Sequence, residues 1–161
     1  MTTSLSGIEI VDIAKKIEVC GQAFYDAAIG HFDDGEIRQL FTFLRNEERR
    51  HETEFEALLS HVEEADGEWR DNEEYAGYMR NLAEYRVFPD PEAARALAVA
   101  IDEPTAVLRH AMNFEKDSIL FLHEMRPLIR EEDRTMVDRL LDEERKHLRL
   151  LGDMHEKMSK R

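Results

Sequence analysis

The chain has 161 residues, a formal net charge of −14 and a single cysteine, Cys20. This length predicts one domain over residues 1–161 that buries its own core, and one cysteine excludes an internal disulfide and zinc sites built from several thiolates. The acidic charge, with no basic patch to offset it, argues against binding to the phosphate backbone of nucleic acids.

The N-terminal segment, MTTSLSGIEIVDIAKK, has neither the basic start nor the long apolar run of a signal peptide. No stretch of the sequence approaches the roughly 20 apolar residues that are needed to cross a bilayer. A lone cysteine also suits a reducing compartment. We therefore expect a cytoplasmic protein with no membrane partner.

The first expected element is a helix from about Gly7 to Gly30, with Ser6 as its N-cap. Its core-facing line follows the period of a helix and comprises Val11, Ala14, Glu18, Gly21, Tyr25 and Ala28. A second helix, from about Glu36 to Glu64, has the alternating spacing of a packed bundle. Its core-facing residues are Ile37, Phe41, Leu44, Glu48, His51, Phe55, Leu58 and Val62.

Residues 65–102 show weaker periodicity than the segments on either side. A short helix is expected around Glu73 to Glu84, and Pro91 suits the first turn of another. The segment is long for a hairpin loop between antiparallel helices. It therefore predicts a crossover that runs the length of a helix bundle.

The third long helix is expected from Glu103-Pro104 to about Met125, and the fourth from about Glu131 to Met158. Their core-facing residues are Leu108, Ala111, Glu115, Ser118, Leu122 and Met125 in the third, and Val137, Leu140, Glu144, His147, Leu151, Met154 and Met158 in the fourth. The sequence thus predicts an all-α fold, a four-helix bundle of two helix pairs joined by a long crossover with short helices.

Each long helix carries one glutamate where its apolar line should hold another leucine. These four residues are Glu18, Glu48, Glu115 and Glu144. In two helices a histidine follows three residues later, His51 and His147, on the same helix face. Burying four carboxylates without partners costs several kcal/mol each, and two divalent metal ions would balance their charge. The set matches the known template of bundles that hold di-iron or di-manganese carboxylate centres.

Other charged side chains near this set are expected at the surface, because helical acids are rarely buried. The acids expected to face solvent are Glu47, Glu52, Asp142 and Glu143. The histidines expected to be exposed or hydrogen-bonded are His31, His61, His110, His123 and His155. The basic pairs Arg49-Arg50 and Arg145-Lys146 are expected to face outward or bridge to surface acids.

Four segments resemble the rubrerythrin branch of the ferritin-like superfamily, over nearly the whole chain. These are EVCGQAFYDAA, FTFLRNEERRHETEFEALL, AMNFEKDSILFLHEM and LLDEERKHLRLL, one in each long helix. The resemblance implies a ferritin-like fold and a non-haem di-iron site that reacts with peroxide or dioxygen. It assigns ligand roles to Glu18, Glu48, His51, Glu115, Glu144 and His147. It also implies that Tyr25 donates a hydrogen bond to a carboxylate, whereas ordinary core packing is the alternative.

Two departures from the resembled family matter for function. Full rubrerythrins carry a C-terminal rubredoxin domain with four cysteines, which this chain lacks, so the electron donor stays open. The family also carries an extra glutamate three residues after the third-helix ligand, where this chain has Ser118. Since that carboxylate takes part in peroxide chemistry, a simpler centre closer to those of ferritins is the alternative.

The expected function is that of a diiron peroxidase or ferroxidase-type oxidoreductase, which oxidises Fe(II) with hydrogen peroxide or dioxygen in oxidative-stress defence or iron handling. The resemblance also implies a homodimer. Iron storage or delivery is one alternative, and a non-enzymatic metal sensor or helical interaction module is another. The same donors accept manganese or a mixed metal pair. Haem is not expected, because a methionine at helical spacing is usually core filler.

Overall fold

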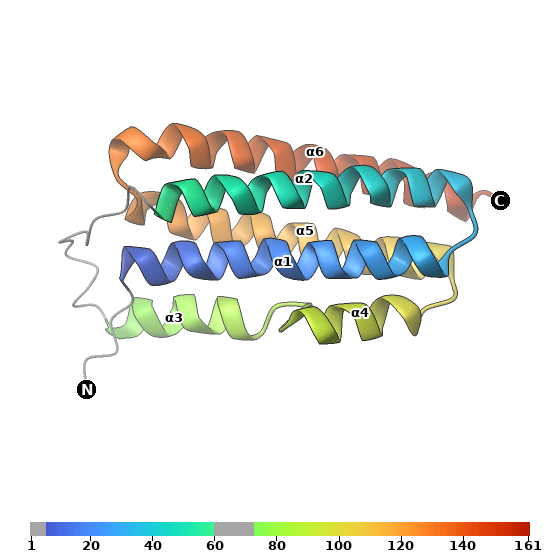
Figure 1. Cartoon of the computed structure of the whole chain (residues 1–161), viewed down its shortest axis with the longest axis horizontal. Coiled ribbons are helices and arrows are strands. Elements are labelled where there is room, and N and C mark those ends of the chain that lie inside the picture. The colour runs from blue at the N-terminus through green and yellow to red at the C-terminus, as the bar shows by residue number, and fades with distance from the viewer. Residues whose placement is uncertain (1–5, 60–72) are drawn as a thin grey trace.

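The computed structural model of the chain describes residues 6–59 and 73–161. Over these residues it contains six α-helices and no strand, which confirms the expected all-α fold (Figure 1). Four long helices lie side by side: α1 (Gly7–His31), α2 (Gly35–Leu59), α5 (Pro104–Met125) and α6 (Arg134–Ser159). The predicted second helix extended to Glu64, but residues 60–64, with His61 and Val62, lie outside the described part of the chain.

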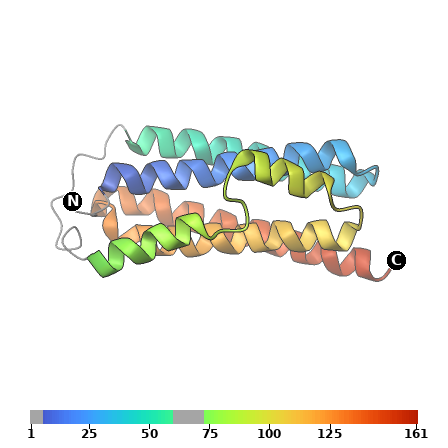
Figure 2. The ribbon, with the colours of Figure 1, turned by 90° about the horizontal axis from the view of Figure 1, so that it is seen from below.

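The crossover contains two short helices, α3 (Glu73–Glu84) and α4 (Pro91–Val99), as expected. They follow one another along the length of the bundle (Figures 1 and 2). α4 packs against α1 and α3 packs against α5, so the crossover covers one side of the bundle.

Local sequence signals set the helix starts. The Ser6 hydroxyl accepts a hydrogen bond from the Glu9 backbone N–H, and the Glu9 carboxylate accepts one from the Ser6 backbone N–H, forming a capping box. Asp90 caps α4, with Pro91 in the first turn. The fourth long helix begins later than expected: Glu131–Asp133 form a 3₁₀ turn, the tighter geometry common at helix starts, and α6 follows at Arg134.

The core follows the predicted helix faces closely. Every described residue on the four core-facing lines is buried except Met154 and Met158, which are half-buried. Met154 lines a groove between α2 and α6, and this groove explains its partial exposure. Phe88 from the crossover stacks on Phe24 of α1 and Phe114 of α5, with ring centroids 4.6 and 5.2 Å apart. None of the described helices is long and apolar enough to span a membrane.

Candidate metal centre

The six predicted ligand side chains meet inside the bundle as two overlapping groups. One group comprises Glu18, Glu48, His51 and Glu144, and the other comprises Glu48, Glu115, Glu144 and His147. Within each group the potential ligand atoms lie within 4.8 Å of one another. All six residues are buried, with at most 2% of the surface of each exposed.

Two glutamates belong to both groups and face both histidines. Glu48 places Oε2 3.6 Å from Nδ1 of His51 and Oε1 3.7 Å from Nδ1 of His147. Glu144 places Oε1 2.9 Å from Nδ1 of His51 and Oε2 3.0 Å from Nδ1 of His147. Each carboxylate therefore presents one oxygen to each side of the cluster, which is the orientation that a carboxylate bridging two metal ions requires.

The other two glutamates each lie near only one of the two histidines. Glu18 places Oε2 3.5 Å from Nδ1 of His51, and Glu115 places Oε2 3.7 Å from Nδ1 of His147. The two imidazole rings are stacked, with centroids 5.5 Å apart. The cluster thus has two similar halves, each with one histidine and one glutamate of its own.

The cluster's own donors fit a pair of divalent cations. Several of its buried polar atoms have no hydrogen-bond partner: Oε2 of Glu18, both carboxylate oxygens of Glu48 and Oε2 of Glu115. Buried polar atoms are normally satisfied, and a buried charge is normally paired or bound to metal. Carboxylate oxygens and imidazole nitrogens are donors that iron and manganese accept.

Protons take part in the charge balance of the metal-free cluster. Burial and neighbouring carboxylates raise the pKa of Glu48 well above its usual range. Burial and the charge of Glu144 raise the pKa of Glu115 to about 8. Burial opposes the charged form of His147, but the neighbouring carboxylates of Glu115 and Glu144 outweigh it and raise its pKa to about 10. Binding of a metal ion here would therefore displace protons from these side chains.

Tyr25 contacts the cluster from α1. Its hydroxyl lies 2.5 Å from Oε1 of Glu115 and donates a hydrogen bond to it. Burial and the charge of Glu115 raise the pKa of Tyr25 well above its usual range, so the hydroxyl keeps its proton. Gly21, one turn before Tyr25, makes room for Phe114: a Cβ at Gly21 would lie 2.5 Å from the ring.

Two acids that were expected to face solvent, Glu47 and Glu143, lie against the outer nitrogens of the histidines instead. Oε2 of Glu143 lies 3.1 Å from Nε2 of His51, and Oε2 of Glu47 lies 3.8 Å from Nε2 of His147. Each acid thus approaches the histidine of the opposite helix. A carboxylate at Nε2 favours the tautomer in which Nδ1 is free to bind metal.

The sequence does carry a signal for these acids, because a Glu-Glu pair precedes the histidine at the same spacing in both helices. Arg50 joins the two acids, with Nη2 2.7 Å from Oε2 of Glu47 and 3.0 Å from Oε2 of Glu143. Asp142 is exposed as expected, whereas Glu52 is half-buried and accepts a hydrogen bond from Gln22.

Comparison with known proteins identifies the family. The Rubrerythrin family model matches residues 9–155, most of the chain and all six cluster residues. The chain belongs to the rubrerythrin family. A solved structure from Thermotoga maritima, provisionally described as a ferritin-like diiron-carboxylate protein, has a TM-score of 0.70 and 25% sequence identity. The match covers 95% of this rubrerythrin-family chain and 96% of the other. No curated protein matches the sequence significantly.

Proposed function

We propose that this rubrerythrin-family chain binds two iron ions and oxidises Fe(II) with hydrogen peroxide or dioxygen. The observation that carries the proposal is the pair of shared carboxylates, Glu48 and Glu144, each with one oxygen toward each histidine. Two bound ferrous ions would supply one electron each, enough to reduce one hydrogen peroxide to two waters with uptake of two protons.

The proposed ligands are Glu18, Glu48, His51, Glu115, Glu144 and His147. Four carboxylates suit a site that must hold Fe(III), because hard anionic oxygens stabilise the higher charge. The same donor set would accept manganese or a mixed pair, and iron is proposed because the family and its structural relative point to it.

In this proposal Tyr25 positions Glu115. Its hydroxyl donates to Oε1 and leaves Oε2, which has no hydrogen-bond partner, toward His147. Fixing one oxygen restricts rotation of the carboxylate and holds the other oxygen toward the metal side. Glu143 plays the corresponding part for the ring of His51.

The rest of the proposal follows from family membership. We propose a homodimer that acts in the cytoplasm, and a separate reductant, either a small molecule or a redox protein, that returns the iron to Fe(II). Neither nucleic acid nor a membrane has a part in this function.

A ferritin-like role in iron storage or delivery is the second candidate. Ser118 favours it, because a hydroxyl stands where the resembled family carries an additional carboxylate. The centre then has the simpler six-ligand set, and oxidised iron would be passed on instead of being reduced again at the same place.

The test begins with anaerobic loading of the metal-free protein with two Fe(II) per chain. Substoichiometric hydrogen peroxide or dioxygen is then added, and Fe(III) formation is followed by its near-ultraviolet absorbance. We expect one peroxide to oxidise two iron ions, much faster than in the Glu48→Ala variant. Oxidation no faster than that of Fe(II) in buffer would contradict the proposal, and many iron ions retained per chain after aerobic loading would favour storage.

A further inference from the structure

A cavity of about 290 Å³ lies between α2 and α6 and reaches the candidate ligand His147. Its other lining residues are Phe43, Glu47, Glu143, Lys146, Arg149 and Leu150. The basic side chains Lys146 and Arg149 are exposed, the two acids are half-buried, and His147 is 2% exposed. The cavity therefore leads from solvent to the edge of the metal centre.

Phe43 forms the wall of this cavity next to His147. Phe43 is 44% exposed, and its phenyl ring contacts the imidazole of His147 edge to face, with ring centroids 6.0 Å apart. Aromatic pairs prefer this edge-to-face geometry, so the contact favours one rotamer of Phe43. In this rotamer the phenyl ring lies beside His147, the candidate ligand that lines the cavity.

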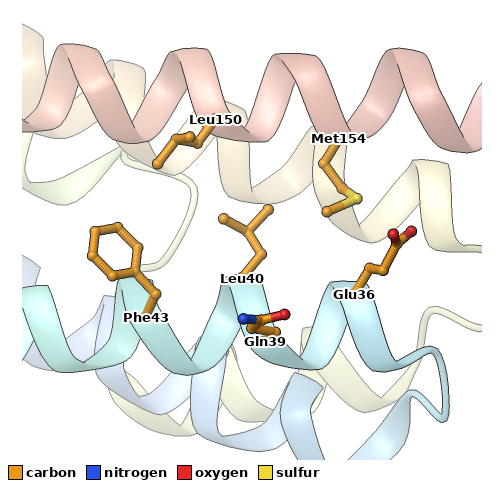
Figure 3. Close-up of a pocket in the computed structure, with 6 residues that line it drawn as sticks. All are labelled: Glu36, Gln39, Leu40, Phe43, Leu150 and Met154. Atoms are coloured by element: carbon orange, nitrogen blue, oxygen red, sulfur yellow. The ribbon is translucent and has the colours of Figure 1, made fainter.

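The same side chain borders a second, larger space. Phe43 and Leu150 face one another across a groove of about 440 Å³ between α2 and α6 (Figure 3). The groove continues along the helices past the apolar side chains of Leu40 and Met154. A cavity of about 150 Å³ accommodates a benzene molecule, so the groove has room for the phenyl ring.

We propose that the cavity at His147 is the route by which divalent metal ions reach the centre, and that Phe43 opens and closes it. Rotation of the ring toward Leu40 and Met154 uncovers His147, and the return covers it. This inference rests on the proposed metal centre. It assigns to Phe43, which is not one of the six proposed ligands, control of the rate at which metal ions enter and leave.

The charges along the cavity suit a cation that has passed its mouth. Glu47 and Glu143 are carboxylates of the kind that a divalent ion accepts, and because the two share the single guanidinium of Arg50, negative charge is left over for a cation. Arg50 holds both acids by hydrogen bonds, so they are fixed near the outer nitrogens of the histidines. The net charge of −14 attracts cations to the molecule as a whole, although Lys146 and Arg149 oppose this at the mouth.

The test measures the rates of Co²⁺ binding to the metal-free full chain and of its removal by excess chelator, by stopped-flow absorbance. Phe43→Ala should speed both rates about three- to tenfold, because the wild-type ring must leave its preferred rotamer each time. Phe43→Trp should slow both rates. The affinity and the number of cobalt ions bound should stay unchanged, since opening a route speeds passage in both directions alike.

Leu120→Ala is the matched control. Leu120 has the same 44% exposure but lies on α5 beside a different cavity, one lined by Tyr78 and Tyr85. Its rates should equal those of the wild type. Circular dichroism and thermal unfolding establish that each variant is folded, and Phe43→Trp keeps the test decisive if Phe43→Ala does not fold.

Each contrary outcome has a distinct meaning. Absence of cobalt binding by the wild type would overturn the metal centre itself. Full binding with unchanged rates in both Phe43 variants would overturn the gate while leaving the centre intact. The gate is also overturned if Leu120→Ala accelerates exchange equally, or if Phe43→Ala changes the affinity with no parallel change in the two rates.

Discussion

The two helix pairs of the bundle supply matching candidate ligands but different neighbours. α1 and α2 supply Glu18, Glu48 and His51, and α5 and α6 supply Glu115, Glu144 and His147. Seven residues beyond the lone glutamate, α1 has Tyr25 where α5 has Leu122. Three residues beyond it, α1 has Gly21 where α5 has Ser118.

The comparison shows that the two helix pairs are alike at the candidate ligands and differ at the residues that pack beside them. In the proposed centre both halves would need a buried glutamate and a Glu-x-x-His, because two ions would need similar donors. The positions beside them follow from contacts across the bundle: Tyr25 reaches Glu115, whereas Leu122 has no hydroxyl to offer Glu18. The His51 side and the His147 side of the cluster should therefore offer the same kinds of ligand, but hydrogen bonds should restrict the ligands of the two sides to different degrees.

The largest expected effect is on the number of metal ions bound, which should fall further when a shared glutamate is removed than when a glutamate of one side is removed. Glu48→Ala removes a carboxylate that faces both histidines and should abolish binding of both metal ions. Glu18→Ala removes a ligand of one side and should leave one ion bound. Elemental analysis after anaerobic Fe(II) loading and desalting measures both. Asp142→Ala, which removes an exposed acid, should retain both ions, and equal losses in Glu48→Ala and Glu18→Ala would contradict the sharing.

The next largest effect is expected on metal affinity, when the hydrogen bond from Tyr25 to Glu115 is removed. Tyr25→Phe removes the hydrogen bond to Glu115 and should weaken one of the two metal sites by about 10–100-fold, the usual effect of losing an outer partner of a ligand. The other site should change little, which a two-site isothermal titration would resolve. Leu122→Met, at the matching position, should alter neither site. Equal weakening of both sites in Tyr25→Phe would show that the halves do not act separately.

A smaller effect is expected on stability. Gly21→Ala places a Cβ against the ring of Phe114 and should lower the free energy of unfolding by about 1–3 kcal/mol through overpacking. Urea unfolding of the metal-free protein measures this. The control is Gly30→Ala in the same helix, where an added Cβ meets nothing within 4 Å. That change should be neutral or stabilising, because alanine favours helix, and equal destabilisation by both substitutions would contradict the packing argument.

The smallest effect is expected at Ser118, the counterpart of Gly21. Its Oγ is buried and has no hydrogen-bond partner. Ser118→Ala removes an unsatisfied polar group, so the free energy of unfolding should fall by no more than about 0.5 kcal/mol and could rise. Thermal unfolding followed by circular dichroism would measure it, and a loss above about 1 kcal/mol would mean that the hydroxyl stabilises the metal-free fold.

Much of the fold could be predicted from the sequence because helical periodicity repeats over long segments. The first helix ends within one residue of its expected end, and the short helix at Glu73–Glu84 has its expected bounds. The sequence predicts the four buried glutamates because each interrupts an apolar line, and the two buried histidines because they follow at helical spacing.

The residues that surround the centre could not be predicted in the same way. Glu47 and Glu143 flank the apolar lines, where a helical period indicates the surface. Only the approach of α2 to α6 brings each acid to a histidine of the opposite helix. Phe43 lies at a position that is exposed by the same rule, and its contact with His147 also depends on that approach.

The most direct test of the shared centre is anomalous diffraction at the iron edge from crystals grown anaerobically with Fe(II). We predict two peaks about 3.5–4 Å apart, as in two-metal sites, one beside His51 and one beside His147, with Glu48 and Glu144 bridging them. A single peak, or two peaks that share neither carboxylate, would contradict the account.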